Sequence, residues 1–277
     1  MRKLLDLGFK QSKVDECVFY QGKTLYLLYT YDSLIAGPAD KKEIETVIDD
    51  LQKKAKLAIA VEGELYDFLG VNIERQSDGS IHMSQPHLID QILDDLQLND
   101  ENIKPRSPAA SSKLLTRQRG ESEPFDGSFN FRSVIGKLNY LEKATRSDSS
   151  YVVHQCARFV SCPKREHGEA VRWLGRYLKG TRKMGTILKP MPNNKDLEVY
   201  VDASFCGDWD PKEAAIDCDT ARSRHGYLIS YAGCQLLWKS QLQTEIALSR
   251  TESQYTPGLS YALRDAIPIM ELLKEMK

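Results

Sequence analysis

The chain has 277 residues, which is enough for about two domains of ordinary size. Hydrophobic residues make up 41% of it and the formal net charge is -1, a balance that is typical of a globular protein and argues against an overall polyanion-binding charge. The lack of a long apolar run predicts no transmembrane helix and no membrane partner, and the apolar run near the basic N-terminus is too short for a signal peptide.

The six cysteines show no Cys-x-x-Cys spacing. This pattern favours free thiols in a reducing, intracellular compartment over a disulfide framework. It does not distinguish the cytoplasm from the nucleus.

A β-hairpin is predicted near the start of the chain. Apolar, β-prone residues at 25–28 and 34–36 flank a polar tip that contains Tyr31 and Asp32. Taken alone, the pattern is typical of an ordinary hairpin with tyrosines on one face.

The next elements alternate in type. Charged residues with apolar positions at helical spacing predict a helix over 40–55. A second hairpin is predicted from 68–75 and 81–84, and Pro86 opens another helix. Residues 99–128 are rich in Ser, Pro and charge, and we expect a linker there.

The second half changes character at about residue 197. Two or more helices are predicted between 131 and 178, ending at Gly180. Three short strands and a final helix are predicted after them, at 197–202, 225–231, 235–238 and 251–275.

A basic cluster lies at the end of the helical part. Its members are Lys164, Arg165, Arg172, Arg176, Lys179, Arg182, Lys183 and Lys189. Such a cluster can neutralise backbone phosphates and would make nucleic-acid binding sensitive to salt. The alternative is the solvated face of an amphipathic helix, because Trp173 and Leu174 belong to an apolar stripe at helical spacing. Both interpretations can hold at once.

Several ordered blocks resemble one protein family. They are YTYDSLIAG from Tyr29, YDFLGVNIERQSDGSIHMSQPHLIDQIL from Tyr66, FRSVIGKLNYLEKATRSDSSYVVHQCARF from Phe131, VYVDASFCGDWD from Val199 and LWKSQLQTEIALSRTESQY from Leu237. In this order and spacing the blocks resemble the Pol polyprotein of copia-type LTR retrotransposons. The resemblance implies an α+β fold: a partial reverse-transcriptase palm of β-hairpins plus helices, a helical thumb and connection, and a truncated ribonuclease H-like mixed sheet with one helix.

The resemblance also implies a domain order and an ancestral chemistry. Residues 1–98 correspond to the C-terminal part of the palm and the start of the thumb, 99–128 to a linker, 129–190 to the helical connection, and 191–277 to a truncated ribonuclease H-like domain. The family implies RNA-directed DNA synthesis and cleavage of RNA in RNA–DNA hybrids, with paired Mg²⁺ ions as cofactors. The implied partners are an RNA or DNA template-primer, an RNA–DNA hybrid and the remaining polyprotein domains.

The expected metal ligands are only partly present. The family hairpin reads Tyr-x-Asp-Asp, so Tyr31 falls on the first aspartate and Asp32 on the second. A phenol with a pKa of about 10 is neutral at pH 7 and does not replace a carboxylate. Asp202 resembles the first ribonuclease H metal ligand, although an aspartate at a strand end is by itself usually a turn residue. Gln254 stands where the family has the glutamate of Glu-x-Glu-Tyr, and an amide loses the charge that a divalent ion needs.

Nearby residues predict how the last helix begins. Glu252 fits a capping box with Ser249, and a competing box would pair Thr251 with Gln254.

A proline soon afterwards complicates this helix. Pro257 removes an amide donor, so we expect the helix to restart with Thr256 as its cap and Pro257 at its first position.

We therefore expect a catalytically inactive remnant, with Asp202 and Asp32 as surviving positions and Mg²⁺ not bound as a pair. We also expect the chain to begin after the strand with the first polymerase aspartate and to stop before the last two ribonuclease H aspartates. Two alternatives remain: a non-catalytic nucleic-acid-binding protein, and a fragment of an active polyprotein that a mistaken gene model has cut short.

Overall fold

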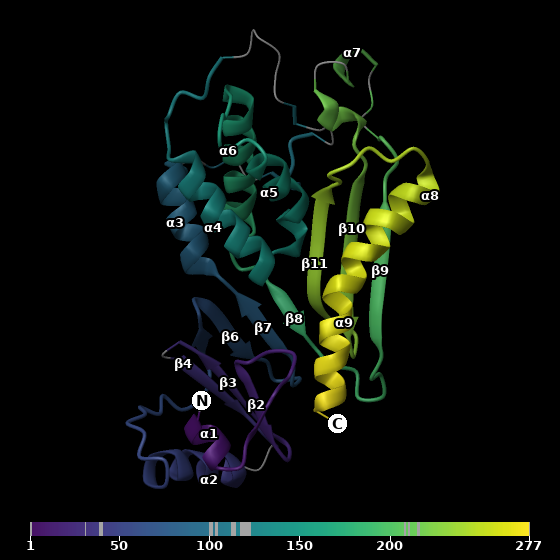
Figure 1. Cartoon of the computed structure of the whole chain (residues 1–277). Coiled ribbons are helices and arrows are strands. Elements are labelled where there is room, and N and C mark those ends of the chain that lie inside the picture. The colour runs from purple at the N-terminus through teal and green to yellow at the C-terminus, as the bar shows by residue number, and fades with distance from the viewer. Residues whose placement is uncertain are drawn as a thin grey trace. The chain divides into compact units, whose positions relative to one another are not determined.

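The computed structural model describes residues 2–30, 32–38, 41–99, 102, 105–111, 115–116, 123–207, 209, 211–214 and 217–276. These residues form an α+β fold, as predicted, with three antiparallel sheets (Figure 1). The expectation of a mixed sheet in the last part was wrong for the described residues, because the strands Leu197–Ala203, Arg224–Tyr231 and Cys234–Leu242 pair only antiparallel. The described residues divide into an N-terminal unit, Met1–Glu64 with Leu263–Lys277, and a central unit, Leu65–Ala262.

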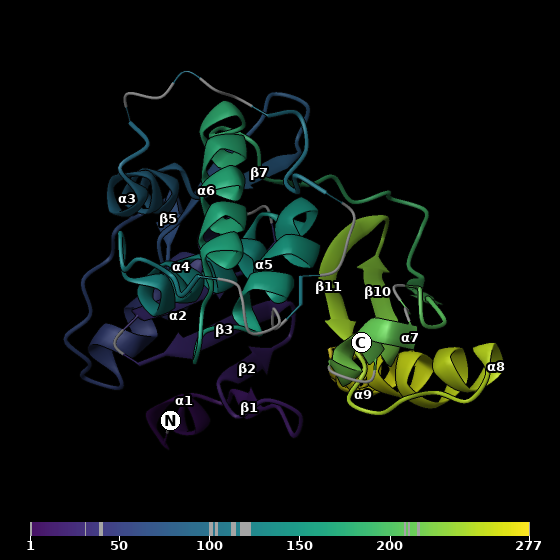
Figure 2. The same cartoon turned by 90° about the horizontal axis from the view of Figure 1, so that it is seen from above.

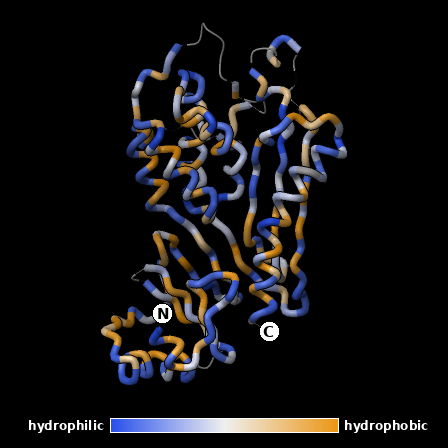
Figure 3. Tube along the Cα trace, viewed as in Figure 1, coloured by the Kyte–Doolittle hydropathy of each residue, from blue (hydrophilic) through white to orange (hydrophobic). Residues whose placement is uncertain are grey.

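The N-terminal unit is built around the predicted hairpin. Its elements are α1 (Arg2–Asp6), β1 (Lys10–Gln11), β2 (Val18–Gln21), β3 (Thr24–Tyr29), β4 (Asp32–Ala36) and α2 (Lys41–Lys53). The four strands pair in sequence order, and Tyr29 lies opposite Asp32 beside a turn in which Thr30 has a φ of 49°. The hairpin prediction is confirmed. The predicted helix over 40–55 is also confirmed as α2, in which blue polar segments alternate with orange apolar ones in Figure 3.

The core of this unit is small. Leu4, Phe9, Phe19, Tyr26 and Leu51 are its buried members. A polar contact adds the end of the last helix to the unit.

That polar contact joins two distant parts of the sequence. Ser12 Oγ donates to Glu275 Oε2 at 2.7 Å, and the Lys13 backbone N–H donates to Glu275 Oε1 at 3.1 Å. Ser12 is buried, and its oxygen also accepts from the Val14 N–H at 3.0 Å. The carboxylate of Glu275 is therefore held by the loop between β1 and β2.

A second sheet opens the central unit. It contains β5 (Asp67–Phe68), β6 (Val71–Arg75), β7 (Ile81–Ser84) and β8 (Thr186–Leu188), in that order. The β6–β7 hairpin was predicted. Strand β8 was not, because it is short and pairs with β7 across a long stretch of sequence.

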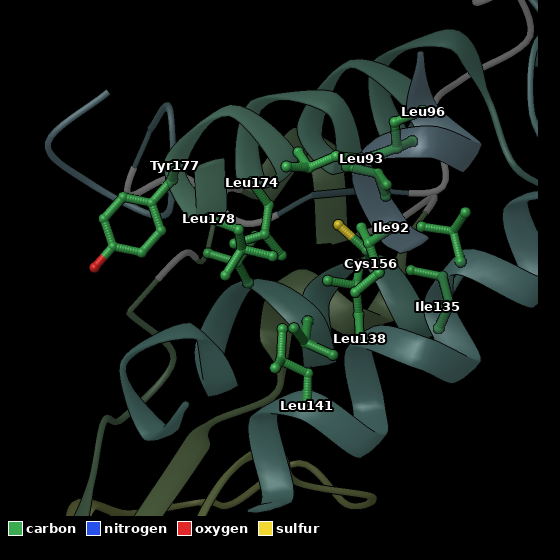
Figure 4. Close-up of a cluster of buried hydrophobic side chains, with 14 of the residues drawn as sticks. Ile92, Leu93, Leu96, Ile135, Leu138, Leu141, Cys156, Leu174, Tyr177 and Leu178 are labelled. Carbon is green, nitrogen blue, oxygen red and sulfur yellow. The ribbon is translucent and has the colours of Figure 1, made fainter. Parts of the chain in front are cut away.

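Four helices supply the main core of the central unit. They are α3 (Pro86–Leu96), α4 (Phe131–Ala144), α5 (Ser150–Ala157) and α6 (Arg165–Gly180), and all lie within predicted helical regions. Figure 2 shows α6 between α3 and α5, and Figure 4 shows apolar side chains from all four helices converging. Gly175 of α6 makes this approach possible, because a Cβ there would lie 2.6 Å from the Leu96 Cδ1 atom.

The third sheet has the order β11–β10–β9. Its strands are β9 (Leu197–Ala203), β10 (Arg224–Tyr231) and β11 (Cys234–Leu242), and the first two match their predicted ranges closely. Strand β11 runs past its predicted end. Between β9 and β10 the described residues include α7 (Pro211–Ala214) and a 3₁₀ turn, Cys218–Ala221.

The last helix differs from the prediction. It runs as α8 (Arg250–Ser253), a π-helical segment η3 (Gln254–Leu259) and α9 (Ser260–Glu275), without restarting at Thr256. The expectation of a second cap was wrong, because the wider π turn accommodates Pro257. The Gln243 side chain donates to the Ser253 carbonyl, which is the group that residue 257 would bind in an α-helix.

Candidate metal site and basic helix

Asp202 lies one residue before the end of β9. It is exposed and sits opposite Gly226 in the sheet. Its Oδ1 atom accepts a hydrogen bond from the Ala203 backbone N–H at 2.9 Å. The carboxylate is therefore engaged by the strand's own backbone.

The helix that carries Gln254 covers the other face of this strand. A Cβ at Gly258 would lie 3.4 Å from Val201 Cγ1 and 3.8 Å from Ala203 Cβ, so η3 packs on the face of β9 that these two residues occupy. Side chains along a strand alternate between faces, so Asp202 points to the opposite face. The structure does not bring the Asp202 carboxylate to the helix-covered face.

A buried histidine marks the helix-covered face. His225 sits opposite Ala203, and its ring stacks on Tyr261 of α9 with 5.1 Å between ring centroids. Its two ring nitrogens have no hydrogen-bond partner among the described residues. Burial, with the charges of Lys239 and Arg224, lowers the pKa of His225 to about 4.

The residues around Gln254 have structural roles. Gln254 is exposed. The Glu252 N–H donates to Ser249 Oγ at 3.1 Å, and Glu252 Oε2 accepts from the Leu248 N–H at 2.7 Å. The Ser249–Glu252 cap is thus the one that forms. The Glu252 carboxylate serves the start of the helix.

The hairpin positions lie in the other unit. Asp32 is exposed and begins β4, whereas Tyr31 lies outside the described residues. Asp32 belongs to the N-terminal unit and Asp202 to the central unit.

A pair of Mg²⁺ ions requires clustered anionic oxygen ligands. Among the residues that the structure describes, no group of three or more His, Cys, Asp or Glu side chains is arranged to hold a metal ion. Asp202 contributes one carboxylate, which already accepts the Ala203 N–H, and Gln254 contributes an amide. These residues do not fit the family's metal pair.

The basic cluster falls largely on α6, and two of its members hold the chain that follows α3. Arg172 donates to the Leu96 carbonyl at 3.0 Å and lies over the Phe129 ring at 5.5 Å. Lys179 donates to the Leu98 carbonyl at 2.9 Å and also to the Asn99 carbonyl. Arg172 and Lys179 therefore stabilise the turn at the end of α3.

Two further arginines form ion pairs. Arg182 binds Asp90 through two nitrogens, and its hydrogen bonds lower the pKa of the Asp90 carboxyl. Arg165 pairs with Glu123 at 2.8 Å and with Glu169 at 3.1 Å.

The other four basic positions differ in environment. Lys189 pairs with Asp78 at 2.8 Å. Lys183 is exposed, Arg176 lines a pocket of about 540 Å³ between α5 and α6, and the Lys164 backbone N–H donates to His167 Nδ1 at 3.0 Å. The apolar stripe of α6 is buried at Leu174, so the amphipathic helix is confirmed. Binding of phosphates by its polar face stays a prediction.

The sequence patterns did not predict a charged network around the buried side chain of Arg146. Arg146 is 1% exposed and binds both carboxylate oxygens of Asp148, at 2.9 and 2.8 Å. It also donates to Thr181 Oγ1 at 2.8 Å, while the Tyr177 hydroxyl donates to Asp148 Oδ2 at 2.8 Å. Burial opposes ionisation of Asp148, but the Arg146 interactions leave its pKa below the ordinary value. The sequence feature that could have revealed this network is the pair of opposite charges at Arg146 and Asp148, two positions apart.

A second ionic contact anchors the loop before β10. Asp219 is buried and pairs with Arg158, the residue after α5, at 2.5 Å and with Arg222 at 2.7 Å. Close by, burial and the charge of Arg224 lower the pKa of His154 to about 3.

Comparisons with known proteins find relatives among transposon proteins. No family model and no solved structure matches this chain. It is 32% identical over 252 residues, 87% of its length, to the retrovirus-related Pol polyprotein from transposon TNT 1-94 of Nicotiana tabacum. It is 30% identical over 258 residues to the corresponding polyprotein from transposon RE1 of Arabidopsis thaliana.

These alignments cover 18% and 16% of the two polyproteins, so the chain spans less than a fifth of their length. A shorter relative is a putative transposon Ty5-1 protein of Saccharomyces cerevisiae, which is 27% identical over 260 residues and is covered to 78%. Across the described helices, none is long and apolar enough to cross a bilayer. By these similarities, the chain is homologous to part of the retrovirus-related Pol polyproteins of copia-type LTR retrotransposons.

Proposed function

We propose that this chain derives from the part of a Pol polyprotein that joins reverse transcriptase to ribonuclease H, and that it catalyses neither reaction. In this proposal residues 1–98 descend from the palm and the start of the thumb, 129–190 from the connection, and 191–277 from ribonuclease H, with 99–128 as a linker. The ancestral substrates are a template-primer and an RNA–DNA hybrid.

The observation that carries the proposal is the state of the ribonuclease H position. Asp202 points away from the helix that bears residue 254, and residue 254 is a glutamine. One carboxylate without a second anionic ligand holds Mg²⁺ weakly, because the ion prefers several hard oxygen ligands. Asp202 and Asp32 are proposed as remnants of the two ancestral sites.

The test is a pair of assays on the purified chain, with Mg²⁺ or Mn²⁺ present. One measures primer extension on an RNA template, and the other measures cleavage of the RNA strand in an RNA–DNA hybrid. The Asp202→Asn variant is the matched control, because it removes the charge and keeps the shape. Activity of the unmodified chain equal to that of Asp202→Asn supports the proposal. Metal-dependent activity above that control contradicts it.

Nucleic-acid binding without catalysis is the second candidate. The concentration of basic residues on and after α6 supports it, and the exposed Lys183 is one such residue. The contacts of Arg165, Arg172, Lys179 and Arg182 within the chain reduce the charge that is left for phosphates.

A further inference from the structure

A pocket of about 540 Å³ lies in the central unit, where the neighbouring helices α5 and α6 meet the segment that precedes α4 (Figure 2). Much of its wall is apolar and comes from Val152 of α5, Ala170 of α6, and Ala109 and Leu115 of the preceding segment. The volume is within the range of small-molecule sites, and an apolar lining with few polar groups is their usual composition. The pocket therefore has the size and the surface of a ligand site.

The wall that precedes α4 is held against α6. Trp173 Nε1 donates to the Ser107 carbonyl at 3.1 Å. The buried His167 accepts the Lys164 backbone N–H through Nδ1, so its Nε2 atom carries the hydrogen and donates to the Thr116 carbonyl at 2.8 Å. Because side chains of α6 fix this wall on both sides of the pocket, the pocket is more than an opening between two helices.

The side-chain amide of Gln155 lines the pocket and is 2% exposed. Its Oε1 atom accepts from Arg158 Nη1 at 2.9 Å. A guanidinium can only donate, so this contact fixes which end of the amide is the oxygen. Among the described residues, the Nε2 atom at the other end has no hydrogen-bond partner. A buried N–H without an acceptor is unfavourable, so an occupant that brings an acceptor to Gln155 adds a hydrogen bond that the chain alone does not make.

Aromatic and charged side chains define the rest of the occupant. Tyr151 of α5 and Trp173 of α6 both line the pocket, and flat rings pack well against such side chains. The charged lining residues Glu166, Glu169 and Arg176 all have interactions within the chain. A charged occupant would be removed from water without a free partner of opposite charge, so these contacts favour a neutral one.

We propose that this pocket binds a small, flat, neutral aromatic molecule that carries a carbonyl oxygen, and that this oxygen accepts a hydrogen bond from Gln155 Nε2. The ring system packs against the apolar wall and the side chains of Tyr151 and Trp173. The carbonyl supplies the acceptor, and the rings supply the apolar contact.

The experiment compares two flat probes of similar shape, quinolin-2-one and naphthalene, of which only the first carries a carbonyl oxygen. Ligand-observed NMR titration of the full chain gives a Kd for each probe. Gln155→Glu keeps an oxygen for Arg158, which holds the introduced carboxylate ionised, and replaces the Nε2 donor with a second oxygen. The Kd of quinolin-2-one should rise at least about tenfold in this variant, and that of naphthalene should change by less than about twofold.

Measuring each probe on both chains cancels the difference in hydrophobicity between the two probes. An equal change of the two Kd values in Gln155→Glu overturns the proposal. Failure of both probes to bind the unmodified chain at millimolar concentration, where molecules of this size are expected to bind, also overturns it.

A second variant leaves Gln155 in place and covers the case in which Gln155→Glu does not fold. Ala170→Leu adds bulk to the α6 wall, so the Kd of both probes should rise at least about tenfold. The matched control Ala170→Ser adds one small atom and should bind both probes normally. A cooperative melt of each variant confirms its fold. If Ala170→Leu binds the probes as the unmodified chain does, the pocket is not their site and the proposal is wrong.

Discussion

The side-chain amide of Gln243, at the end of the third sheet, donates to the backbone carbonyl of Ser253 at 2.8 Å. Pro257 has no N–H to offer this carbonyl, and the glutamine supplies a donor to it from outside the helix. Gln243 is 1% exposed, and the bond is buried. The sheet therefore stabilises the π-helical segment that begins at Gln254.

Gln243→Leu should lower the free energy of unfolding by about 1–3 kcal/mol, because it removes the buried hydrogen bond from the Gln243 side chain to the Ser253 carbonyl. Urea denaturation of the full chain measures the change. Pro257→Ala restores a backbone N–H, so the loss should be smaller when Gln243→Leu is made in a Pro257→Ala background. Identical losses in the two backgrounds would contradict the assigned role.

The pair between the buried Arg146 and Asp148, whose side chain is 30% exposed, should be far more sensitive to substitution than a surface pair. Asp148→Asn leaves the guanidinium of Arg146 buried with a neutral partner and should cost about 3–5 kcal/mol of stability. The matched control is Arg182→Gln, which removes an ion pair whose partners are about 40% exposed and should cost about 1 kcal/mol or less. If both variants lose a comparable free energy of unfolding in the same denaturation assay, the burial of the arginine does not determine how much the loss of its ion pair costs.

Stability should fall as the pH drops below about 6.5, because the folded chain holds His225 and His154 neutral. Their folded pKa values, about 4 and about 3, lie below the ordinary value of 6.5, so the unfolded chain binds protons first as the pH falls. Their contribution is complete above pH 6.5 and is lost progressively toward pH 4. His225→Phe keeps a ring against Tyr261 and cannot titrate. The difference in melting temperature between pH 7.5 and pH 4.5 should shrink in this variant; an unchanged difference would exclude His225 as a source.

Two substitutions distinguish the basic residues that stabilise the fold from those that are available to bind phosphates. Arg172→Gln should reduce stability, since Arg172 holds the Leu96 carbonyl and the Phe129 ring. Lys183→Gln should leave stability unchanged, because Lys183 is exposed. If the basic cluster contacts phosphates through Lys183, Lys183→Gln lowers the slope of log affinity against log salt for an RNA–DNA hybrid by about 1. A chain that does not bind the hybrid at low salt eliminates the second candidate function.

Restoring one acid should not restore metal binding. Gln254→Glu returns the family residue, but η3 covers the face of β9 opposite Asp202. Calorimetric titration with Mg²⁺ or Mn²⁺ should give the same weak signal for Gln254→Glu as for the unmodified chain. Tight binding in this variant, lost again on addition of Asp202→Asn, would show that the two positions do meet.

Local patterns in the sequence were sufficient for most of the elements. Alternation of apolar residues predicted the hairpins around residue 31 and residue 78, and helical spacing predicted α2 through α6. The path of the last helix could not be predicted in this way, because its support comes from Gln243 on another element. Strand β8 was missed for the same reason: its partner β7 lies about a hundred residues earlier.

The candidate site, too, could be predicted from the sequence only in part. Residue identity alone indicated that Gln254 is not a metal ligand, since an amide carries no charge. That Asp202 and η3 occupy different faces depends on strand pairing and on the packing of Gly258. The contacts of Arg172 and Lys179 with the carbonyls after α3 likewise depend on how α3 and α6 meet. A count of basic residues therefore overestimated the charge that α6 presents to solvent.

The hydrogen bond between Ser12 and Glu275 spans 263 positions of sequence. At synthesis rates of roughly 5–20 residues per second, Ser12 leaves the ribosome on the order of tens of seconds before Glu275 is made. During that interval the β1–β2 loop lacks its carboxylate partner. The Ser12 hydroxyl, which is buried in the folded chain, is therefore still exposed to water or to chaperones. The N-terminal unit is therefore completed only late in translation, although its strands are among the first segments to emerge.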